Sequence, residues 1–290
     1  MAVVTVSKTV GFDIRALNFS TLHRGDTVLA TSTGHIVNHA DGDSNQFRGT
    51  GFRYDSQGDL IGGTVSRYAE YDILGRLVVV TGLAAAASKV NAAADTLSLT
   101  DDRALIRAAL AGNDTFYGSQ QGDYLDGYGG NDTLRGYGGQ DLLAGNAGND
   151  RLYGGHGDDV LRGAAGADLL VGGTGFDTLA GGTGNDVFIF DAPLSPLNAD
   201  RVTDFRNVYG NDDSIKLQNG VMTGLGGTGE LKSALFHAGA AAHDANDRII
   251  YNRSSGALIY DSNGNADGGD TVIAVLSSKP VLTAHDFFVI

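Results

Sequence analysis

Residues 127–162 read GYGGNDTLR, GYGGQDLLA, GNAGNDRLY and GGHGDDVLR, four units of nine residues with glycine at positions one and four, aspartate at position six and leucine at position eight. The same period extends on both sides, from Ala111 to Phe190. Self-similarity at a fixed short period is typical of a solenoid, in which each repeat packs only on its neighbours. The aspartates that recur every nine residues are Asp114, Asp123, Asp132, Asp141, Asp150, Asp159, Asp168, Asp177 and Asp186.

A large apolar residue follows each of these aspartates two positions later. The apolar residues are Phe116, Leu125, Leu134, Leu143, Leu152, Leu161, Leu170, Leu179 and Phe188. Each lies at the centre of a triplet with the alternation of a very short strand, and the six residues before the triplet read as a glycine-rich turn. One such strand buries too little apolar surface to be stable alone. We therefore predict an all-β fold with a parallel β-roll at its centre, in which two nonapeptides form one coil of 18 residues and the apolar side chains stack inside.

Stacking at this period places the aspartates of every second repeat about 4.8 Å apart. Two columns of carboxylates result, one headed by Asp114 and the other by Asp123, and carboxylates this close repel each other unless a cation lies between them. Glycine-rich turns direct backbone carbonyls inward, and an all-oxygen ligand set suits Ca²⁺. The gaps within the two columns predict about seven Ca²⁺. We expect the nine aspartates to bind these ions together with turn carbonyls near Gly130, Gly139, Gly148, Gly157, Gly166 and Gly175.

Residues 111–190 resemble the RTX, or hemolysin-type, calcium-binding repeat. The resemblance implies that the sixth-position aspartates bind Ca²⁺ together with turn carbonyls. Two units depart from the pattern. Gln121 replaces a fourth-position glycine, and the first unit begins with Ala109 and Leu110 in place of glycines. Sites that use these two turns are expected to be weaker or incomplete.

Residues 191–290 alternate short apolar stretches with Asn, Gly and Asp turns, which predicts a small β-rich cap. This order resembles the region after the repeats in RTX proteins exported by type I secretion, such as serralysin-type proteases. The resemblance implies an export signal at the C-terminus, matched here by the acid and hydrophobic residues of Asp286–Ile290. Phe287–Ile290 can also be read simply as a last edge strand, and the two readings are compatible. Candidates for a further Ca²⁺ at the end of the roll are Asp200, Asp204 and Asp213.

The charge and composition narrow the possible partners. The formal net charge is −14, and residues 111–190 contain 11 acidic and 3 basic residues. So acidic a chain is a poor partner for nucleic acid or anionic membranes. The sequence contains no cysteine, so a metal site with thiolate ligands is excluded. It also contains no apolar run of 18 residues, so we expect no membrane-spanning helix. Residues 1–8 lack the basic start and long apolar stretch that are typical of a cleavable signal peptide. Because the resemblance to exported RTX proteins implies a signal at the C-terminus instead, we still expect a secreted, extracellular protein whose first partner is the type I secretion machinery.

The N-terminal third predicts a separate β-rich domain over residues 1–95, an antiparallel meander that covers one end of the roll or packs separately. Residues 96–110 predict a capping helix, with Thr100 as N-cap and Leu105 and Leu110 on one face. The predicted organisation is therefore 1–95, 96–110, the β-roll over 111–190, and the cap with the secretion signal over 191–290.

The sequence contains neither His-Glu-x-x-His nor Gly-x-Ser-x-Gly, the motifs of zinc proteases and lipases. We therefore expect a non-enzymatic, extracellular or cell-surface adhesive or matrix component that binds a polysaccharide or a cell surface. The alternative is a small polysaccharide-modifying enzyme that uses the N-terminal domain, with Arg67 and Tyr68 in its groove. A third possibility is that residues 1–95 serve only as a folding cap.

Overall fold

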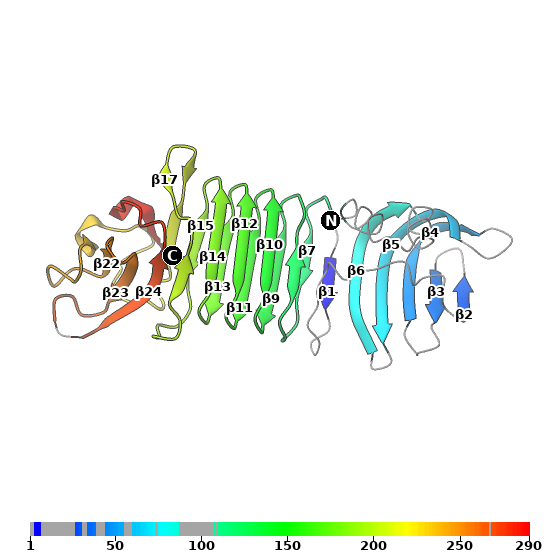
Figure 1. Cartoon of the computed structure of the whole chain (residues 1–290), viewed down its shortest axis with the longest axis horizontal. Helices are drawn as coiled ribbons and strands as arrows, with labels where there is room; N and C mark the ends of the chain where they lie inside the picture. The colour runs from blue at the N-terminus through cyan, green and yellow to red at the C-terminus, as the bar shows by residue number, and fades with distance from the viewer. Residues whose placement is uncertain are drawn as a thin grey trace.

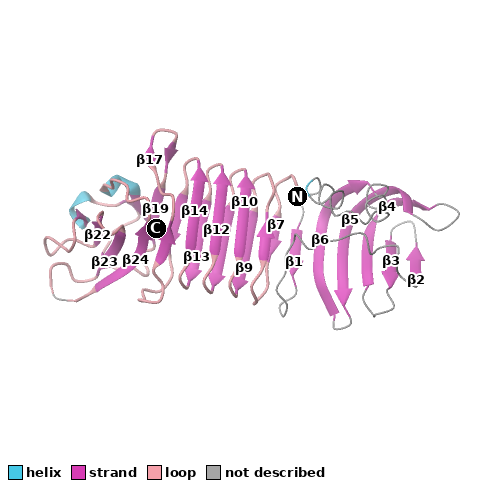
Figure 2. Cartoon of the chain, viewed as in Figure 1, coloured by secondary structure: helices cyan, strands magenta, loops and turns pink. Residues whose placement is uncertain are grey.

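The computed structural model describes the strands of the N-terminal third, Arg107, and residues 110–266 and 268–290 (Figure 1). The N-terminal strands are Val3–Val6 (β1), Thr27–Ala30 (β2), Gly34–Asn38 (β3), Ser44–Tyr54 (β4), Leu60–Asp72 (β5) and Gly75–Ala86 (β6). Strands dominate the described residues, as the colouring in Figure 2 shows.

The repeats form two parallel sheets whose strands alternate along the chain (Figure 1). The strands are Thr115–Tyr117 (β7), Tyr124–Asp126 (β8), Thr133–Gly138 (β9), Leu142–Ala147 (β10), Arg151–His156 (β11), Val160–Ala165 (β12), Leu169–Thr174 (β13), Thr178–Thr183 (β14) and Val187–Phe190 (β15). β7, β9, β11, β13 and β15 are neighbours in one sheet, and β8, β10, β12 and β14 in the other. The register pairs Leu134 with Leu152 and Leu143 with Leu161, residues 18 apart. The predicted β-roll with two nonapeptides per coil is confirmed.

The strands of the roll are longer than the predicted triplets. From β9 to β14 each strand has six residues, so only positions four to six of a repeat remain as a turn. The reason is that the glycines after the triplet continue the backbone ladder. Gly155 of β11 is paired with Gly173 of β13, and Ala164 of β12 is paired with Gly182 of β14. β7 and β8, in the units that depart from the repeat pattern, keep the predicted three residues.

The apolar residues form two stacked columns inside the roll, and every member has 0% exposure. One column contains Phe116, Leu134, Leu152, Leu170, Phe188, Ile215 and Phe287. The other contains Leu125, Leu143, Leu161, Leu179, Val202 and Leu276. The last members come from cap strands Ser214–Leu217 (β19), Phe287–Val289 (β25), Asp200–Val202 (β16) and Asp270–Leu276 (β24). The cap therefore continues both columns.

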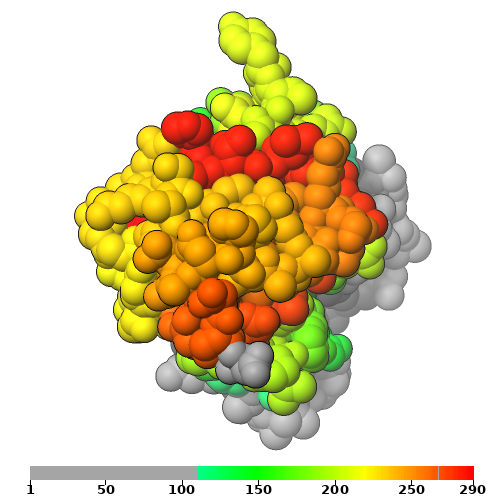
Figure 3. Space-filling view, turned by 90° about the vertical axis from the view of Figure 1, so that its left-hand side faces the viewer, coloured from blue at the N-terminus to red at the C-terminus, as the bar shows by residue number. Residues whose placement is uncertain are grey.

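The C-terminal hundred residues form the predicted β-rich cap. Its other strands are Asn207–Val208 (β17), Asn211–Asp212 (β18), Gly229–Glu230 (β20), Phe236–Ala238 (β21), Ile249–Asn252 (β22) and Ala257–Asp261 (β23), with short 3-10 helices at Ser233–Leu235 and Ala284–Asp286. β22, β23 and β24 are antiparallel neighbours. Figure 3 looks onto this end of the molecule, where the yellow and orange segments of the cap cover the face.

The interpretation of the last residues as an edge strand is wrong. β25 lies between β19 and β20, parallel to the first and antiparallel to the second. Phe287 and Val289 are 0% and 1% exposed because they fill the end of an apolar column.

The N-terminal strands form the predicted antiparallel meander, in the order β2-β3-β4-β5-β6. Its junction with the roll is edge to edge. β1 pairs antiparallel with β6 and parallel with β7, with Val4 opposite Phe116. The meander and one face of the roll therefore share a 14-stranded sheet (Figure 1). Of the predicted helix over 96–110 only Arg107 and Leu110 lie among the described residues, and Leu110 is 2% exposed within the core. Among the described residues, no helix is long and apolar enough to cross a membrane.

A truncation in the apolar column tests how much it contributes. Leu161 is 0% exposed in the middle of its column, and Leu161→Ala should destabilise the calcium-loaded protein by about 2–5 kcal/mol through lost burial and a cavity. The control Leu197→Ala truncates a leucine that is 72% exposed and should cost less than about 0.5 kcal/mol. Urea unfolding in saturating calcium measures both, and equal shifts would contradict the role of the column.

Candidate calcium sites

The nine repeat aspartates are buried at the turns of the roll, none more than 4% exposed. Each accepts a hydrogen bond through Oδ1 from the backbone N–H of the aspartate one coil before it, at 2.7–2.9 Å, except for the first in each column. The successive pairs are Asp114–Asp132, Asp132–Asp150, Asp150–Asp168, Asp168–Asp186, Asp123–Asp141, Asp141–Asp159 and Asp159–Asp177. The structure therefore brings all nine aspartates into the two columns that the repeat spacing predicts.

The second carboxylate oxygen of most of these aspartates has no protein partner. In the stretch 110–266, the Oδ2 atoms that are buried and accept no hydrogen bond include those of Asp132, Asp141, Asp150, Asp159, Asp168, Asp177 and Asp186. A buried acceptor left without a partner is costly, and an ionised carboxylate needs a cation. The two rows of oxygens fit a chain of bound cations.

Backbone oxygens complete the ligand set beside these carboxylates. A Cβ atom added to Gly127 would lie 2.5 Å from Oδ2 of Asp132 and 2.9 Å from the carbonyl oxygen of Gly145. A first-position glycine thus packs between the carboxylate of its own repeat and the carbonyl of the first-position glycine one coil ahead. All of these donors are oxygens, which is the chemistry that Ca²⁺ prefers. Ca²⁺, the ion that the resemblance to RTX repeats implies, therefore fits the oxygen atoms that these residues present.

The fourth-position glycines, near which further carbonyl ligands are predicted, also have a role in packing. These glycines have positive φ angles, from +102° at Gly139 to +136° at Gly166. A Cβ on Gly166 would collide with the carbonyl oxygen of Gly148, the fourth-position glycine one coil before it. Fourth-position glycines therefore allow close stacking of the turns, and the predicted carbonyl ligands near them stay a prediction.

Burial raises the pKa of the repeat carboxyls far above the ordinary value of 3.8. Asp159 is raised to about 8, Asp132, Asp141 and Asp168 to about 7, and Asp177 and Asp186 to about 6. Burial is the largest cause in each case. The hydrogen bond from the preceding coil lowers each pKa in part, and neighbouring carboxylates raise it again. Without a bound cation, the carboxyl group of Asp159 is therefore mostly protonated at neutral pH in the folded roll, and those of Asp132, Asp141 and Asp168 are partly protonated. The carboxyl groups of Asp177 and Asp186 become protonated only as the pH falls through about 6.

This shift predicts how pH acts on the calcium-free protein. The folded-state pKa values of about 6–8 lie above the unfolded value of 3.8, so folding takes up protons between these values. The stability of the calcium-free roll is therefore highest below the unfolded pKa and falls as pH rises from about 4 to about 8. Calcium-stripped protein should show more β signal in circular dichroism at pH 5 than at pH 8. A larger signal at pH 8, measured in the same calcium-free buffer, would contradict this.

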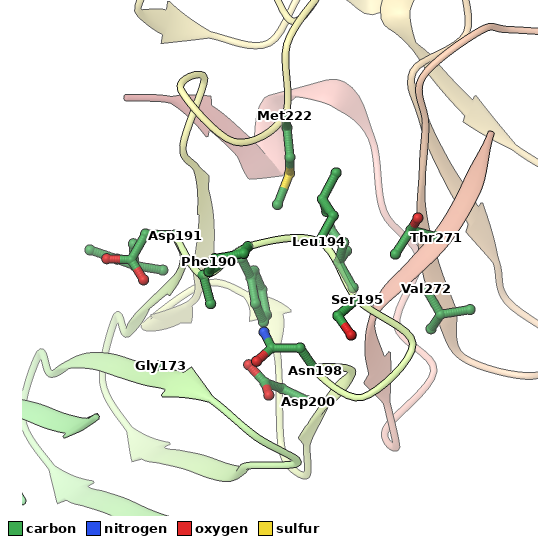
Figure 4. A pocket seen from close by; sticks show the side chains of 14 residues that line it. Gly173, Phe190, Asp191, Leu194, Ser195, Asn198, Asp200, Met222, Thr271 and Val272 are labelled. Atoms are coloured by element: carbon green, nitrogen blue, oxygen red, sulfur yellow. The ribbon is translucent and has the colours of Figure 1, made fainter. Parts of the chain in front are cut away.

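Two of the three aspartates predicted at the end of the roll extend the columns. Asp213 accepts a hydrogen bond from the N–H of Asp186 at 3.0 Å, and Asp200 accepts one from Asp177 at 3.2 Å. Asp204 lies differently, since its two carboxylate oxygens accept from the N–H groups of Gly181 and Gly182. Figure 4 shows Asp200 beside Asn198 in a small pocket of about 10 Å³, room for one water or ion.

The structure gives a physical reason for the expected weakness at the Gln121 turn. Ser119 donates its N–H to Oδ2 of Asp123 at 2.6 Å, and its hydroxyl bonds the backbone of Gln121. Oδ2 of Asp123 is therefore engaged by the backbone. Gln121 also lacks the positive φ of the fourth-position glycines in the later units.

A second ladder at position five is a feature that the sequence reasoning missed. Asn113, Asn131 and Asn149 each accept a hydrogen bond at 2.7 Å from the backbone N–H of the residue 18 positions later. Asp158 does the same for Phe176 at 2.9 Å. These side chains tie successive turns together outside the aspartate column. The recurring Asn-Asp pairs in every second repeat could have revealed the ladder.

A comparison with protein families agrees with this geometry. The model of the RTX calcium-binding nonapeptide repeat (4 copies) matches residues 109–143, 135–170 and 163–192, which include every strand from β7 to β15. No curated protein matches the chain. The buried aspartate columns and this match together identify a protein with an array of RTX calcium-binding nonapeptide repeats over residues 109–192.

Proposed function

We propose that this chain leaves the cell unfolded and folds outside, where about seven Ca²⁺ bind along the two aspartate columns. The observation that supports this most is the row of buried Oδ2 atoms without hydrogen-bond partners among the described residues. Seven ions would also bring the formal net charge from −14 to zero. Calcium is scarce in the cytosol and abundant outside, and binding to such sites contributes directly to the free energy of folding. Single-site affinities should lie in the extracellular range of about 10⁻⁴–10⁻³ M.

In this proposal the ligands are the Oδ2 atoms of the repeat aspartates and the carbonyls of first-position glycines one coil ahead. Asp200 and Asp213 would extend each column by one carboxylate. Bound Ca²⁺ supplies the positive charge that lets the carboxylates stay ionised while buried. The hydrogen bonds between successive aspartates hold Oδ1 in place and direct Oδ2 toward the ion.

Burial of the C-terminal strand supports export before folding. Phe287 and Val289, within the segment that resembles an export signal, are 0% and 1% exposed once the roll is formed. An exporter that reads this segment would have to act on the unfolded chain. Expression of the full chain in cells with and without a type I exporter tests this. Secretion should require the exporter. Equal amounts of the chain in the culture media of cells with and without the exporter would contradict the proposal.

An aromatic and basic surface of the roll supports a role in binding extracellular polysaccharide. The guanidinium of Arg135 lies 4.5 Å above the ring of Tyr153, and Tyr137, 43% exposed, stacks on Tyr117. Arg135, Tyr137 and Tyr153 line a pocket of about 540 Å³ together with Gln120 and residues 154–156. Tyrosine rings suit the apolar faces of sugars, and arginine suits carboxylates. We propose an adhesive or matrix role on an acidic polysaccharide.

Retention on immobilised polygalacturonate in saturating calcium tests this role. Arg135→Ala should reduce binding about tenfold, since it removes the cation and its contact with Tyr153. Arg162→Ala, a matched loss of charge from an exposed site on the other sheet, should leave binding unchanged. Equal effects of both variants would contradict a specific surface. Release of oligosaccharides in the same assay would favour the enzymatic alternative.

A further inference from the structure

His237, His243 and Asp247 meet in the cap, outside the calcium columns, with their ligand atoms all within 4.8 Å of one another. His237 lies in β21, and the other two lie in the loop between β21 and β22. β21 pairs in parallel with β22, with His237 opposite Ile250, so the loop returns beside the strand in which it started. The pairing of two cap strands thus brings two imidazoles and one carboxylate together.

The carboxylate of Asp247 is held in a fixed position. Asp247 is 4% exposed, and its Oδ2 accepts the backbone N–H groups of His243 at 2.6 Å and Asp244 at 3.0 Å. The adjacent Arg248 directs its Nη1 to the carbonyls of Ala245 and Asp247, at 3.0 and 2.7 Å. The two hydrogen bonds to Oδ2 orient the carboxylate of Asp247. In metal sites, hydrogen bonds from surrounding groups orient the ligands in the same way.

The two imidazoles lie against each other. Their rings are stacked nearly parallel, with centroids 5.5 Å apart and an angle of 17°, so one ring has to turn before both nitrogens point at one ion. A Cβ on Gly239 would collide with Nε2 of His237, so glycine at this position leaves room for the ring nitrogen. Oδ2 of Asp244 lies 3.8 Å from Nδ1 of His243 and adds negative charge beside that ring.

We propose that His237, His243 and Asp247 form a three-ligand site for a transition-metal ion of the zinc class, with the fourth position open to water. Two imidazole nitrogens and one carboxylate suit Zn²⁺, Ni²⁺ or Cu²⁺, whereas Ca²⁺ prefers oxygen ligands alone. Ligand atoms around a tetrahedral zinc lie about 3.3 Å apart. The side chain of His243 is 73% exposed and free to rotate, so it can close the remaining distance. The bound metal would tie β21 to the loop before β22 and stabilise the cap.

Calorimetric titration of the full, calcium-saturated chain with ZnCl₂ tests the site, and excess calcium keeps the roll folded throughout. We expect one Zn²⁺ per chain, and a loss of affinity of tenfold or more in His243→Ala, His237→Ala and Asp247→Asn. Co²⁺ should give the visible absorption of a site with nitrogen ligands, and this absorption should vanish in the same variants. Since His243 is exposed, His243→Ala should keep the wild-type calcium midpoint for folding.

Two controls make the result specific. His285→Ala removes an exposed histidine that contacts Glu230. The double variant His35→Ala/His39→Ala removes two histidines of the N-terminal third that are four positions apart in the sequence. Both should bind Zn²⁺ like the wild type. Unchanged zinc binding in His243→Ala, equal losses in His285→Ala, or the absence of binding by the wild-type chain would each overturn the proposal. Calcium-dependent folding is measured separately, so it stands or falls independently of these outcomes.

Discussion

Asp159→Asn should raise the calcium concentration at the folding midpoint about two- to threefold. Asp159 lies in mid-column with Oδ2 buried and without a hydrogen-bond partner. In the proposed function its carboxylate would serve the sites on both sides. Removing one charge of a buried ion pair costs about 3–5 kcal/mol. In the proposed function about seven ions bind as the chain folds. The lost free energy is divided among these binding events, so the calcium concentration at the midpoint changes only about two- to threefold.

The matched control is Asp158→Asn, one residue earlier in the chain. Asp158 is exposed, and its Oδ1 accepts the N–H of Phe176, a bond that an amide oxygen can replace. The same loss of charge should leave the calcium midpoint almost unchanged. Asp150→Asn should act like Asp159→Asn, whereas Asp114→Asn at the start of its column should have a smaller effect. Calcium titrations followed by circular dichroism compare the four variants, and equal shifts in all of them would contradict the assignment of ligands.

Gly166→Ala should be among the most damaging single substitutions in the chain. Gly166 has φ +136°, and an added Cβ would meet the carbonyl oxygen of Gly148 in the coil before it. The left-handed conformation alone costs a non-glycine residue about 1–2 kcal/mol. The backbone collision pushes two stacked turns apart, so the total should exceed about 4 kcal/mol. Urea unfolding in saturating calcium and the calcium midpoint should both report the loss.

Gly112→Ala is the matched control for this substitution. Gly112 occupies the same fourth position in the first unit, but its φ is ordinary and nothing lies within 4 Å of an added Cβ. Alanine there should change stability by less than about 1 kcal/mol, and its smaller unfolded-state entropy favours slight stabilisation. If Gly166→Ala were tolerated as well as Gly112→Ala, close stacking of the turns would not be what holds the roll together.

The sequence predicts the roll well because its determinants recur at a constant spacing. Aspartate at position six and leucine at position eight fix the register, so residues 18 apart, such as Leu134 and Leu152, pair as expected. The strand lengths are not predictable in this way. Glycine has a low intrinsic preference for strands, yet the neighbouring coils hold the glycines after each triplet in the ladder.

Features that depend on irregular or distant pairings escape the sequence. Asp200 and Asp213 are among the candidates read from the sequence, but they follow Asp177 and Asp186 by 23 and 27 residues instead of 18, so the repeat does not show which column each continues. The buried position of β25 and the pairing of β1 with β7 join segments far apart in the chain. The cluster around Asp247 depends likewise on the pairing of β21 with β22. The boundaries proposed for the domains stay a prediction.

A calcium titration of the stripped full-length chain, followed by far-ultraviolet circular dichroism, measures whether calcium drives the folding of the roll. We predict a cooperative gain of β signal with a midpoint near 10⁻⁴–10⁻³ M, reversed by chelator. Mg²⁺ at the same concentration should fail to replace calcium, because it demands tighter octahedral geometry and keeps its waters. A chain that is fully structured and equally stable after exhaustive chelation at neutral pH would contradict this prediction.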